Sequence, residues 1–435
     1  VLTAQSHGVA DFMFAGQPAP GVPREFSARM TGTIQAEISG THSLRLIQCG
    51  RTRVTVDGRV IIDATEGEIP RGDEFFGMAS AELEGDLELS ADAPAEIVIE
   101  FNSRDSTFIG GFRVGLVSTV ERDLIAEAEQ VARECDAAVV VVGTNDDWET
   151  EGRDRDQFDL PGDQAELIRR VAAANPKTVV IVNTGGPHAL DWLDAPNATL
   201  SVGFGGQEMG DALVDVLEGS ADPGGRMPYT TPARYEHTPA YLNYPGENSV
   251  VRYGEGLFIG HRWFDARHVE PAVPFGHGLS YATFEWGTPA VVAAADTALA
   301  GPIAVAVDVR NTSDRAGSDV VQVYVEPPQS VLHRPVRELK GFAKVHLGPG
   351  ESTTATIELD ARAFAYYDPG DADYEALASA APVPAEGGQR HTEAGWYVEP
   401  GDYQIVVGRS AADHVHVVTV TLSGDEHRFS ARHEG

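Results

Sequence analysis

The sequence predicts a multidomain protein in which an α/β domain with a mainly parallel sheet follows one all-β domain and precedes another. Residues 1–119, and again those from 300 to 435, consist of short runs of alternating apolar and polar residues separated by turn residues, as half-buried strands do. Residues 120–289 instead begin with continuous apolar runs that alternate with stretches of helical period, which is typical of βα units. The length of 435 residues suits about two to four such domains.

The composition limits the classes of partner. Acidic residues number 66 and basic residues 32, which gives a formal net charge of -34. Such a surface repels phosphate backbones and anionic lipid headgroups, so neither nucleic acid nor a membrane is an expected partner. No run of about 18 apolar residues predicts a transmembrane helix. No secretion signal is visible after Val1, and the location, cytoplasmic or secreted, stays open.

The first all-β domain is predicted from its strand-like runs. Asp57-Gly58 between two of these runs is a hairpin signal. The choice between a sandwich and a barrel stays open. The predicted strands begin at Phe26, Thr33, His42, Arg53, Val60, Glu96 and Phe112.

The α/β domain is predicted from three units in which apolar strands alternate with amphipathic helices. An apolar stripe from Leu124 to Ala132 predicts the first helix, and Pro161 suits the first turn of the second. Residues 223–286 are irregular and rich in aromatic side chains, so we expect them to wrap and pack onto two domains, with stacking of sugar rings as the alternative explanation. The predicted strands cover residues 137–143, 178–183 and 199–204, and the later helices cover 160–171 and 208–217.

The C-terminal residues predict a β-sandwich of immunoglobulin or fibronectin type. Residues 290–301 are small and alanine-rich and are expected to form a linker before it. Residues 368–392 lack an apolar period and predict a long surface loop. The predicted strands begin at Ile303, Val320, Thr354, Tyr403 and His416.

The densest ionisable cluster, residues 145–156, directly follows the buried strand 137–143. Open α/β sheets place ligand sites at the carboxyl ends of their strands. A carboxylic acid here, flanked by an aromatic ring and by arginines, suits general acid or base chemistry. A solvated acidic loop is the competing interpretation.

Other motifs predict no cofactor and no metal site. The glycine-rich run from Gly203 resembles a phosphate loop, but Glu208 at the helix start would repel phosphate and is better explained as a capping carboxylate. His414 and His416 share one face of a predicted strand, where histidines seldom bind metal. Cys49 and Cys135 fall in different predicted domains, so neither a disulfide framework nor a zinc site is expected.

An ordered series of motifs resembles the C-terminal half of glycoside hydrolase family 3 β-glucosidases over about residues 120–422. Residues 1–118, which include Phe26-Ser-Ala-Arg-Met-Thr-Gly, look like the protective-antigen-type β domain that some members carry as an insert. The series consists of Trp148-Glu-Thr-Glu-Gly-Arg-Asp-Arg, Asn183-Thr-Gly-Gly-Pro, Gly205-Gly-Gln-Glu-Met-Gly, Asp222-Pro-Gly-Gly-Arg-Met-Pro, Tyr253-Gly-Glu-Gly, Pro274-Phe-Gly-His-Gly-Leu-Ser-Tyr and Arg337-Glu-Leu-Lys-Gly-Phe.

This resemblance implies retaining hydrolysis of β-linked glucosides or related glycosides by two carboxylates. It places the general acid/base on Glu151, the glutamate before Gly-x-Asp-Arg, with Glu149 as the fallback. Trp148, Arg153 and Asp154 would support this loop. The family's nucleophile lies in an N-terminal (β/α)₈ barrel that nothing in this sequence resembles, so we expect the barrel to act in cis or in trans.

The resemblance also implies a rim for the substrate's leaving group. Phe75, Phe76 and Phe108 of the first domain are the candidates, with core packing as the alternative explanation. A different class of function stays open, because the same domains could form a non-catalytic protein for carbohydrate binding or assembly. Self-association into a homo-oligomer is a further expectation.

Overall fold

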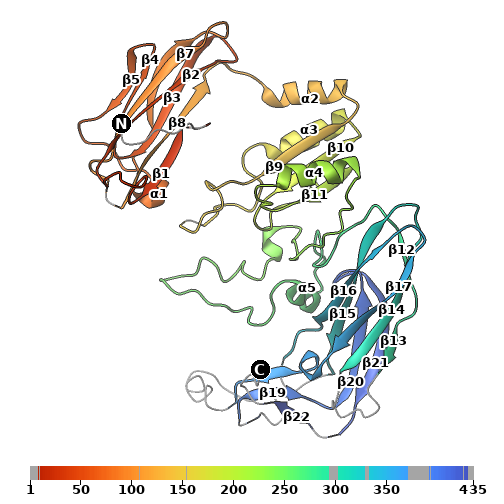
Figure 1. Cartoon of the computed structure of the whole chain (residues 1–435). Helices are drawn as coiled ribbons and strands as arrows, with labels where there is room; N and C mark the ends of the chain where they lie inside the picture. The colour runs from red at the N-terminus through yellow and green to blue at the C-terminus, as the bar shows by residue number, and fades with distance from the viewer. Residues whose placement is uncertain are drawn as a thin grey trace. The chain divides into compact units, whose positions relative to one another are not determined.

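The computed structural model divides into two compact units, Val1–Glu127 and Ala128–Gly435 (Figure 1). Helix α2 (Leu124–Glu134) crosses the division between them. The structure describes residues 8, 10–106, 108–152, 154–292, 302–328, 333–370, 391, 393–424 and 426–429.

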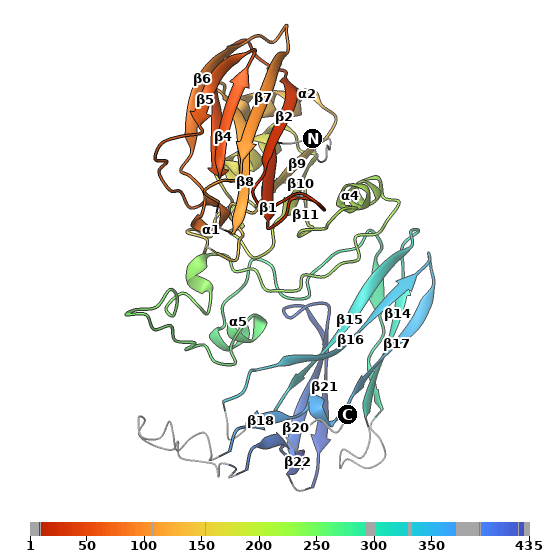
Figure 2. The same cartoon turned by 60° about the vertical axis from the view of Figure 1, so that its left-hand side comes forward.

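The described strands of the first unit form a β-sandwich of two four-stranded antiparallel sheets (Figure 2). This settles the open choice in favour of the sandwich. One sheet has the order β1-β8-β3-β6 and the other β2-β7-β4-β5. Their bounds are β1 Asp11–Ala15, β2 Ser27–Ile34, β3 Gly40–Cys49, β4 Arg51–Val56, β5 Arg59–Ala64, β6 Leu83–Leu89, β7 Ala95–Asn102 and β8 Ile109–Ser118.

Alternation along these strands produces the sandwich core. In β4, for example, Thr52, Val54 and Val56 are buried while the intervening residues are half-buried. The predicted hairpin is present, since Asp57 and Gly58 both have positive φ and join β4 to β5. The apolar core that the two sheets share includes Leu44, Leu46, Val54, Ile62, Leu87, Ile99, Phe101 and Phe112.

The second unit begins with the predicted α/β layers. The described strands of these layers form a parallel sheet in the order β11-β10-β9, and α2 and α3 pack on one face through Ala132, Ile168 and Val171 (Figure 1). On the other face of β9, Val139 and Val141 are 52% and 63% exposed. The bounds are β9 Ala138–Gly143, α3 Gln164–Ala174, β10 Thr178–Asn183, β11 Ala198–Ser201 and α4 Met209–Glu218.

The irregular segment 223–286 contains one helix that periodicity did not predict, α5 (His261–Arg267). A 3₁₀ turn, η1 (Tyr235–His237), precedes it. The segment packs against one side of strand β15 (Gly317–Glu326), where Phe275 packs against the apolar cluster that contains the fully buried Tyr324. Gln322 of the same side donates a hydrogen bond to the Gly276 carbonyl at 3.0 Å. The segment therefore covers one side of β15.

The C-terminal β-sandwich packs β14 and β17 against β15 and β20 around an apolar core. In its described part, one sheet has the order β12-β14-β13 with β17 also pairing to β14, and the other has the order β16-β15-β20-β21. A small sheet, β18-β19-β22, adjoins them. The bounds are β12 Phe284–Trp286, β13 Ala290–Val292, β14 Ile303–Asn311, β16 Glu338–Leu347, β17 Ser352–Leu359, η2 Ala361–Ala363, β18 Tyr366–Asp368, β19 Gly395–Val398, β20 Gly401–Gly408, β21 His414–Leu422 and β22 His427–Phe429.

The start of this sandwich differs from the prediction. β12 and β13 pair with β14 of the sandwich, whereas the sequence placed them in the wrap and the linker. They were not predicted as strands because both are only three residues long and show no period. The rest of the predicted linker, 293–301, lies outside the described residues, as do 371–390 and residue 392 of the predicted loop. Among the helices that the structure describes, none combines the length and hydrophobicity that a membrane span requires.

Candidate active site

The acidic loop leaves the sheet at the carboxyl end of β9 and turns at once. The backbone amides of Trp148 and Glu149 donate to the Asn145 carbonyl at 3.0 and 2.9 Å. The Asn145 side chain also accepts from the Asp147 amide at 3.0 Å, as asparagine commonly does two residues ahead in a turn. The loop therefore starts with a fixed backbone.

Glu149 points its carboxylate toward the sheet. Its Oε1 accepts a hydrogen bond from Thr144 Oγ1 at 2.6 Å and another from the Gly185 amide at 3.1 Å. Arg155 Nη1 lies 3.8 Å from the same oxygen. The Glu149 side chain is 19% exposed. This carboxylate thus connects the end of β9, the end of β10 and the far side of its own loop.

The residues after β10 are shaped for that contact. A Cβ at Gly185 would lie 2.2 Å from Glu149 Oε2 and 2.8 Å from the Phe204 ring, closer than real Cβ atoms approach. Nearby, His188 is buried against Trp192, and burial lowers the pKa of His188. Arg155 Nη2 donates to the Pro187 carbonyl at 2.8 Å, which ties the acidic loop to this segment a second time.

The other predicted residues of the loop differ in their exposure. Glu151 is exposed, and Trp148 is half-buried. Asp154 accepts a hydrogen bond from the Tyr244 hydroxyl of the irregular segment, which raises the pKa of Tyr244. Arg153 lies outside the described residues. The structure thus brings Glu149 and Glu151 to one edge of the sheet in different environments.

Sequence reasoning missed Thr144, Gly185 and Tyr244 as partners of the loop. The first two had a usable signal, because neighbouring parallel strands end at the same edge and the Asn183-Thr-Gly-Gly-Pro motif follows the next strand along the chain. Tyr244 had none, since the segment that carries it has no periodicity. Glu208 is at the N-cap position of α4 as predicted, but its side chain makes no capping hydrogen bond and instead accepts from Gln207.

The three phenylalanines of the first unit lie in unlike settings. Phe76 and Phe108 are 66% and 69% exposed, whereas Phe75 is half-buried. Phe75 and Phe76 both have left-handed backbone angles, with φ of 51° and 60°, inside the short turn α1 (Glu74–Gly77). Bulky residues rarely adopt these angles. Because the side chains of Phe76 and Phe108 are mostly exposed, core packing does not explain these two residues.

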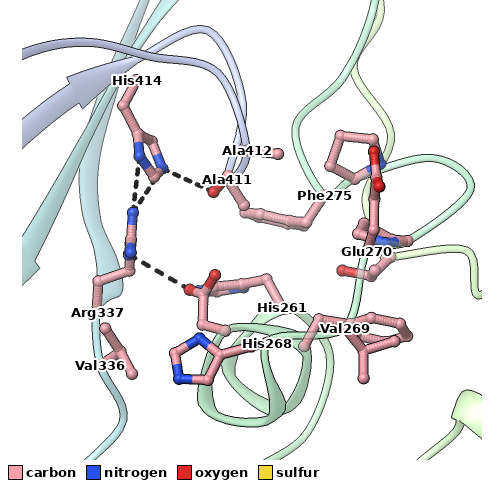
Figure 3. A pocket seen from close by; sticks show the side chains of 15 residues that line it. His261, His268, Val269, Glu270, Phe275, Val336, Arg337, Ala411, Ala412 and His414 are labelled. Atoms are coloured by element: carbon pink, nitrogen blue, oxygen red, sulfur yellow. Dashed lines mark hydrogen bonds and ion pairs between the residues drawn. The ribbon is translucent and has the colours of Figure 1, made fainter.

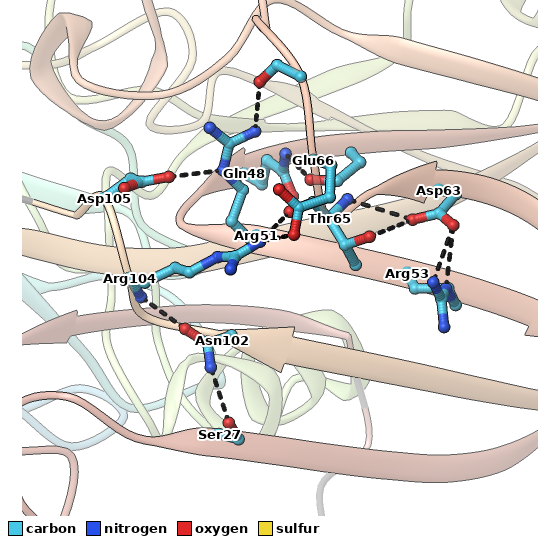
Figure 4. A network of polar contacts seen from close by, with 12 residues as sticks. Ser27, Gln48, Arg51, Arg53, Asp63, Thr65, Glu66, Asn102, Arg104 and Asp105 are labelled. Atoms are coloured by element: carbon cyan, nitrogen blue, oxygen red, sulfur yellow. Dashed lines mark hydrogen bonds and ion pairs between the residues drawn. The ribbon is translucent and has the colours of Figure 1, made fainter.

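A polar network fastens the loops of the same unit (Figure 4). Arg51 forms an ion pair with Asp105 at 2.7 Å and donates to the Gly67 carbonyl at 2.8 Å. Arg104 pairs with Glu66 at 2.5 Å. Hydrogen bonds from Thr65 and then from Arg53 lower the pKa of Asp63. These contacts hold residues 63–67 and 104–105 together at the surface.

A pocket of about 320 Å³ lies within the second unit between α5 and the C-terminal sandwich (Figure 3). Arg337 Nε is 3.4 Å from Asp265 Oδ2, and Arg337 Nη1 donates to His414 Nδ1 at 2.8 Å. Burial raises the pKa of Asp265 and lowers that of His261 to about 4. Because a guanidinium can only donate, His414 accepts the hydrogen bond from Arg337.

Within the described part of the chain, no group of three or more His, Cys, Asp or Glu side chains has an arrangement suited to a metal ion. Cys49 and Cys135, both within the described residues, are free thiols.

Comparison with protein families gives two matches. The glycosyl hydrolase family 3 C-terminal domain matches residues 14–281. The fibronectin type III-like domain matches residues 319–411. The first match includes the β-sandwich of the first unit as well as the α/β layers.

Similar proteins were found by sequence and by structure. A β-glucosidase from Rhizobium radiobacter is 38% identical over 410 residues, which cover 92% of this chain and 47% of that protein. A probable β-glucosidase I from Aspergillus terreus is 35% identical over 420 residues, covering 93% and 47%. The crystal structure of a Kluyveromyces marxianus β-glucosidase in complex with glucose superimposes with a TM-score of 0.80 at 34% identity, covering 97% and 47%. The chain spans about half the length of these relatives.

Proposed function

Because this chain belongs to glycosyl hydrolase family 3, we propose that it supplies the general acid/base of a retaining β-glucosidase, and that Glu151 is this residue. The observation that supports the proposal is the exposed carboxylate of Glu151 on a loop fixed at the carboxyl edge of a parallel sheet. Glu151 also holds the position before Gly-x-Asp-Arg that the family resemblance assigns to the acid. β-Glucosidase is the name of the similar proteins from Rhizobium radiobacter and Kluyveromyces marxianus.

The chemistry needs a second carboxylate. In retaining hydrolysis one carboxylate attacks the anomeric carbon while an acid, about 5–5.5 Å away, protonates the departing glycosidic oxygen. Glu151 would give its proton to that oxygen in the first step and take one from water in the second. The nucleophile would come from a barrel of the kind that the resemblance implies, joined in cis or supplied in trans. The substrate would be a β-linked glucoside or a related glycoside.

The exposed rings of Phe76 and Phe108 favour a second candidate function. Sugar rings stack on exposed aromatic faces, so these rings suit the edge of the subsite that binds the substrate's leaving group. Without catalysis, they would suit a carbohydrate-binding surface.

Hydrolysis of an aryl β-glucoside tests the proposal, with the purified chain alone and then with the N-terminal half of the Rhizobium radiobacter relative added. Glu151→Gln should lower turnover of a glucoside with a poor leaving group by about 100-fold or more, with a smaller loss for an activated aryl glucoside. Asp156→Asn, an exposed carboxylate of the same loop, is the control. Unchanged turnover of the poor substrate in Glu151→Gln contradicts the assignment, and sugar binding without hydrolysis favours the second function.

A further inference from the structure

We propose that Glu149 is a positioning residue: its carboxylate fixes the loop that presents Glu151. This inference rests on the proposed function of Glu151 for its catalytic meaning. The contacts of Glu149 themselves are independent of that function. The two glutamates are two residues apart, yet Glu149 is 19% exposed and bonded to its surroundings while Glu151 is exposed.

The carboxylate of Glu149 joins two strand ends that the sheet already holds together. β9 and β10 are paired in parallel up to Gly143 and Asn183, and the Thr144 amide then donates to the Asn183 carbonyl at 3.1 Å. Glu149 Oε1 accepts from Thr144 Oγ1 at 2.6 Å and from the Gly185 amide at 3.1 Å. The loop is therefore fastened to the hydrogen-bonded ends of β9 and β10.

The far end of the loop is fastened to the same place. Arg155 Nη1 lies 3.8 Å from Glu149 Oε1, and Arg155 Nη2 donates to the Pro187 carbonyl at 2.8 Å. Residues 149 and 155 therefore enclose Glu151 between two anchored points. An acid that must reach a glycosidic oxygen benefits from such support, because small misplacements of catalytic groups are costly.

The same contacts argue against Glu149 as the acid itself. Oε1 is engaged by two donors, and Oε2 lies so close to Gly185 that a Cβ there would be 2.2 Å away. A general acid needs an oxygen that a substrate can approach within hydrogen-bond distance. Both oxygens of Glu149 instead face groups of the protein, which suits a structural support for the neighbouring acid.

The first test uses this chain as it is and measures amide hydrogen exchange. Glu149→Ala removes the acceptor and should speed exchange several-fold in peptides covering 144–152 and 183–188. Glu149→Gln keeps an acceptor oxygen for both donors and should exchange nearly as the wild type does. Thr144→Val removes one donor alone and serves if Glu149→Ala does not fold. Wild-type exchange in both Glu149→Ala and Thr144→Val overturns the proposal.

The second test measures turnover in whichever preparation hydrolyses an aryl β-glucoside. Glu149→Ala should lower turnover of a poor substrate roughly 10- to 100-fold, as loss of a supporting contact does elsewhere, and Glu149→Gln should restore most of it. Equal losses in both variants, with rescue by azide on an activated substrate, would identify Glu149 as the acid and overturn the proposal. Failure of wild-type hydrolysis would count against the proposed function, while the exchange test still judges the role of Glu149 in the loop.

Discussion

Arg226 and Asp319 form a buried ion pair that joins the irregular segment to the C-terminal sandwich. The Arg226 Nη2 to Asp319 Oδ1 distance is 2.9 Å, and the side chains are 13% and 6% exposed. The second oxygen of Asp319 accepts a hydrogen bond from the indole of Trp286 at 2.8 Å. Asp319 of β15 therefore binds both Arg226 of the irregular segment and Trp286 of β12.

Removing one partner should destabilise the second unit strongly. Asp319→Ala leaves the Arg226 guanidinium buried without its carboxylate, and such changes cost about 3–5 kcal/mol of unfolding free energy. Asp319→Asn keeps an acceptor for Trp286 and should cost less. Denaturant unfolding followed by tryptophan fluorescence measures the difference, with the exposed Asp314→Ala as control. A loss in Asp319→Ala no larger than in the control would show that the pair contributes little.

Gly185→Ala should disturb the acidic loop (residues 145–156), although Gly185 itself lies outside that loop. The added methyl group would collide with Glu149 and with Phe204, and forced overpacking typically costs about 1–3 kcal/mol. Gly186→Ala is the matched control, because nothing lies within 4 Å of a Cβ at that position. Thermal unfolding should show a lower midpoint for Gly185→Ala alone. Equal midpoints in the two variants would mean that Glu149 moves aside freely.

The second unit should lose stability as the pH falls from about 6.5 to 4. Burial lowers the pKa of His261 to about 4, so the unfolded chain takes up the proton first and unfolding is favoured in this range. The loss attributable to His261 is about 3 kcal/mol at most. His261→Gln should flatten the pH dependence of the unfolding free energy, whereas the exposed His346→Gln should not. The raised pKa of Asp265 favours the folded state as the pH falls, but Asp265 is present in the wild type and in both histidine variants, so comparing them isolates the effect of His261.

The exposed face of β9 should make the chain self-associate. Val139 and Val141 present adjacent apolar side chains on an edge strand, and such edges pair or aggregate readily. Sedimentation velocity should detect concentration-dependent association that the double change Val139→Thr and Val141→Thr reduces. Val60→Thr, in the first unit, provides the control. A monomer at every concentration would contradict the expectation.

The left-handed angle of Phe76 predicts an unusual response to glycine. Left-handed angles cost a residue with a Cβ about 1–2 kcal/mol, and glycine avoids this cost. Phe76→Gly should therefore be about 1 kcal/mol more stable than Phe76→Ala in denaturant unfolding. If Phe76 borders the substrate, both variants should weaken binding of aryl β-glucosides equally. Lower stability of the glycine variant would show that the angle is not strained.

The sequence predicted many elements with a strong period and missed α5, which has none, but β6 and β16 were also missed although their residues alternate. Apolar runs such as Val139 to Val142 identified the parallel sheet, and alternation identified both all-β domains but predicted a sandwich only for the C-terminal one. α5 was not predicted because its contacts, such as that of His261 with Tyr324, come from distant segments rather than from a repeating stripe. The environments of Glu149 and Glu151 could not be separated either, since burial two residues apart in a loop depends on the partners that folding brings near.

Strand β15 is buried on both sides, with Val321, Val323 and Val325 in the sandwich core and Gln322 and Tyr324 against the irregular segment. If the irregular segment separated from β15, the side of the strand that carries Gln322 and Tyr324 would be exposed to water, which would also weaken the sandwich. The C-terminal sandwich is thus not a transferable module that can be cut out at a boundary near residue 300. It should melt in a single cooperative transition together with the segment that covers it.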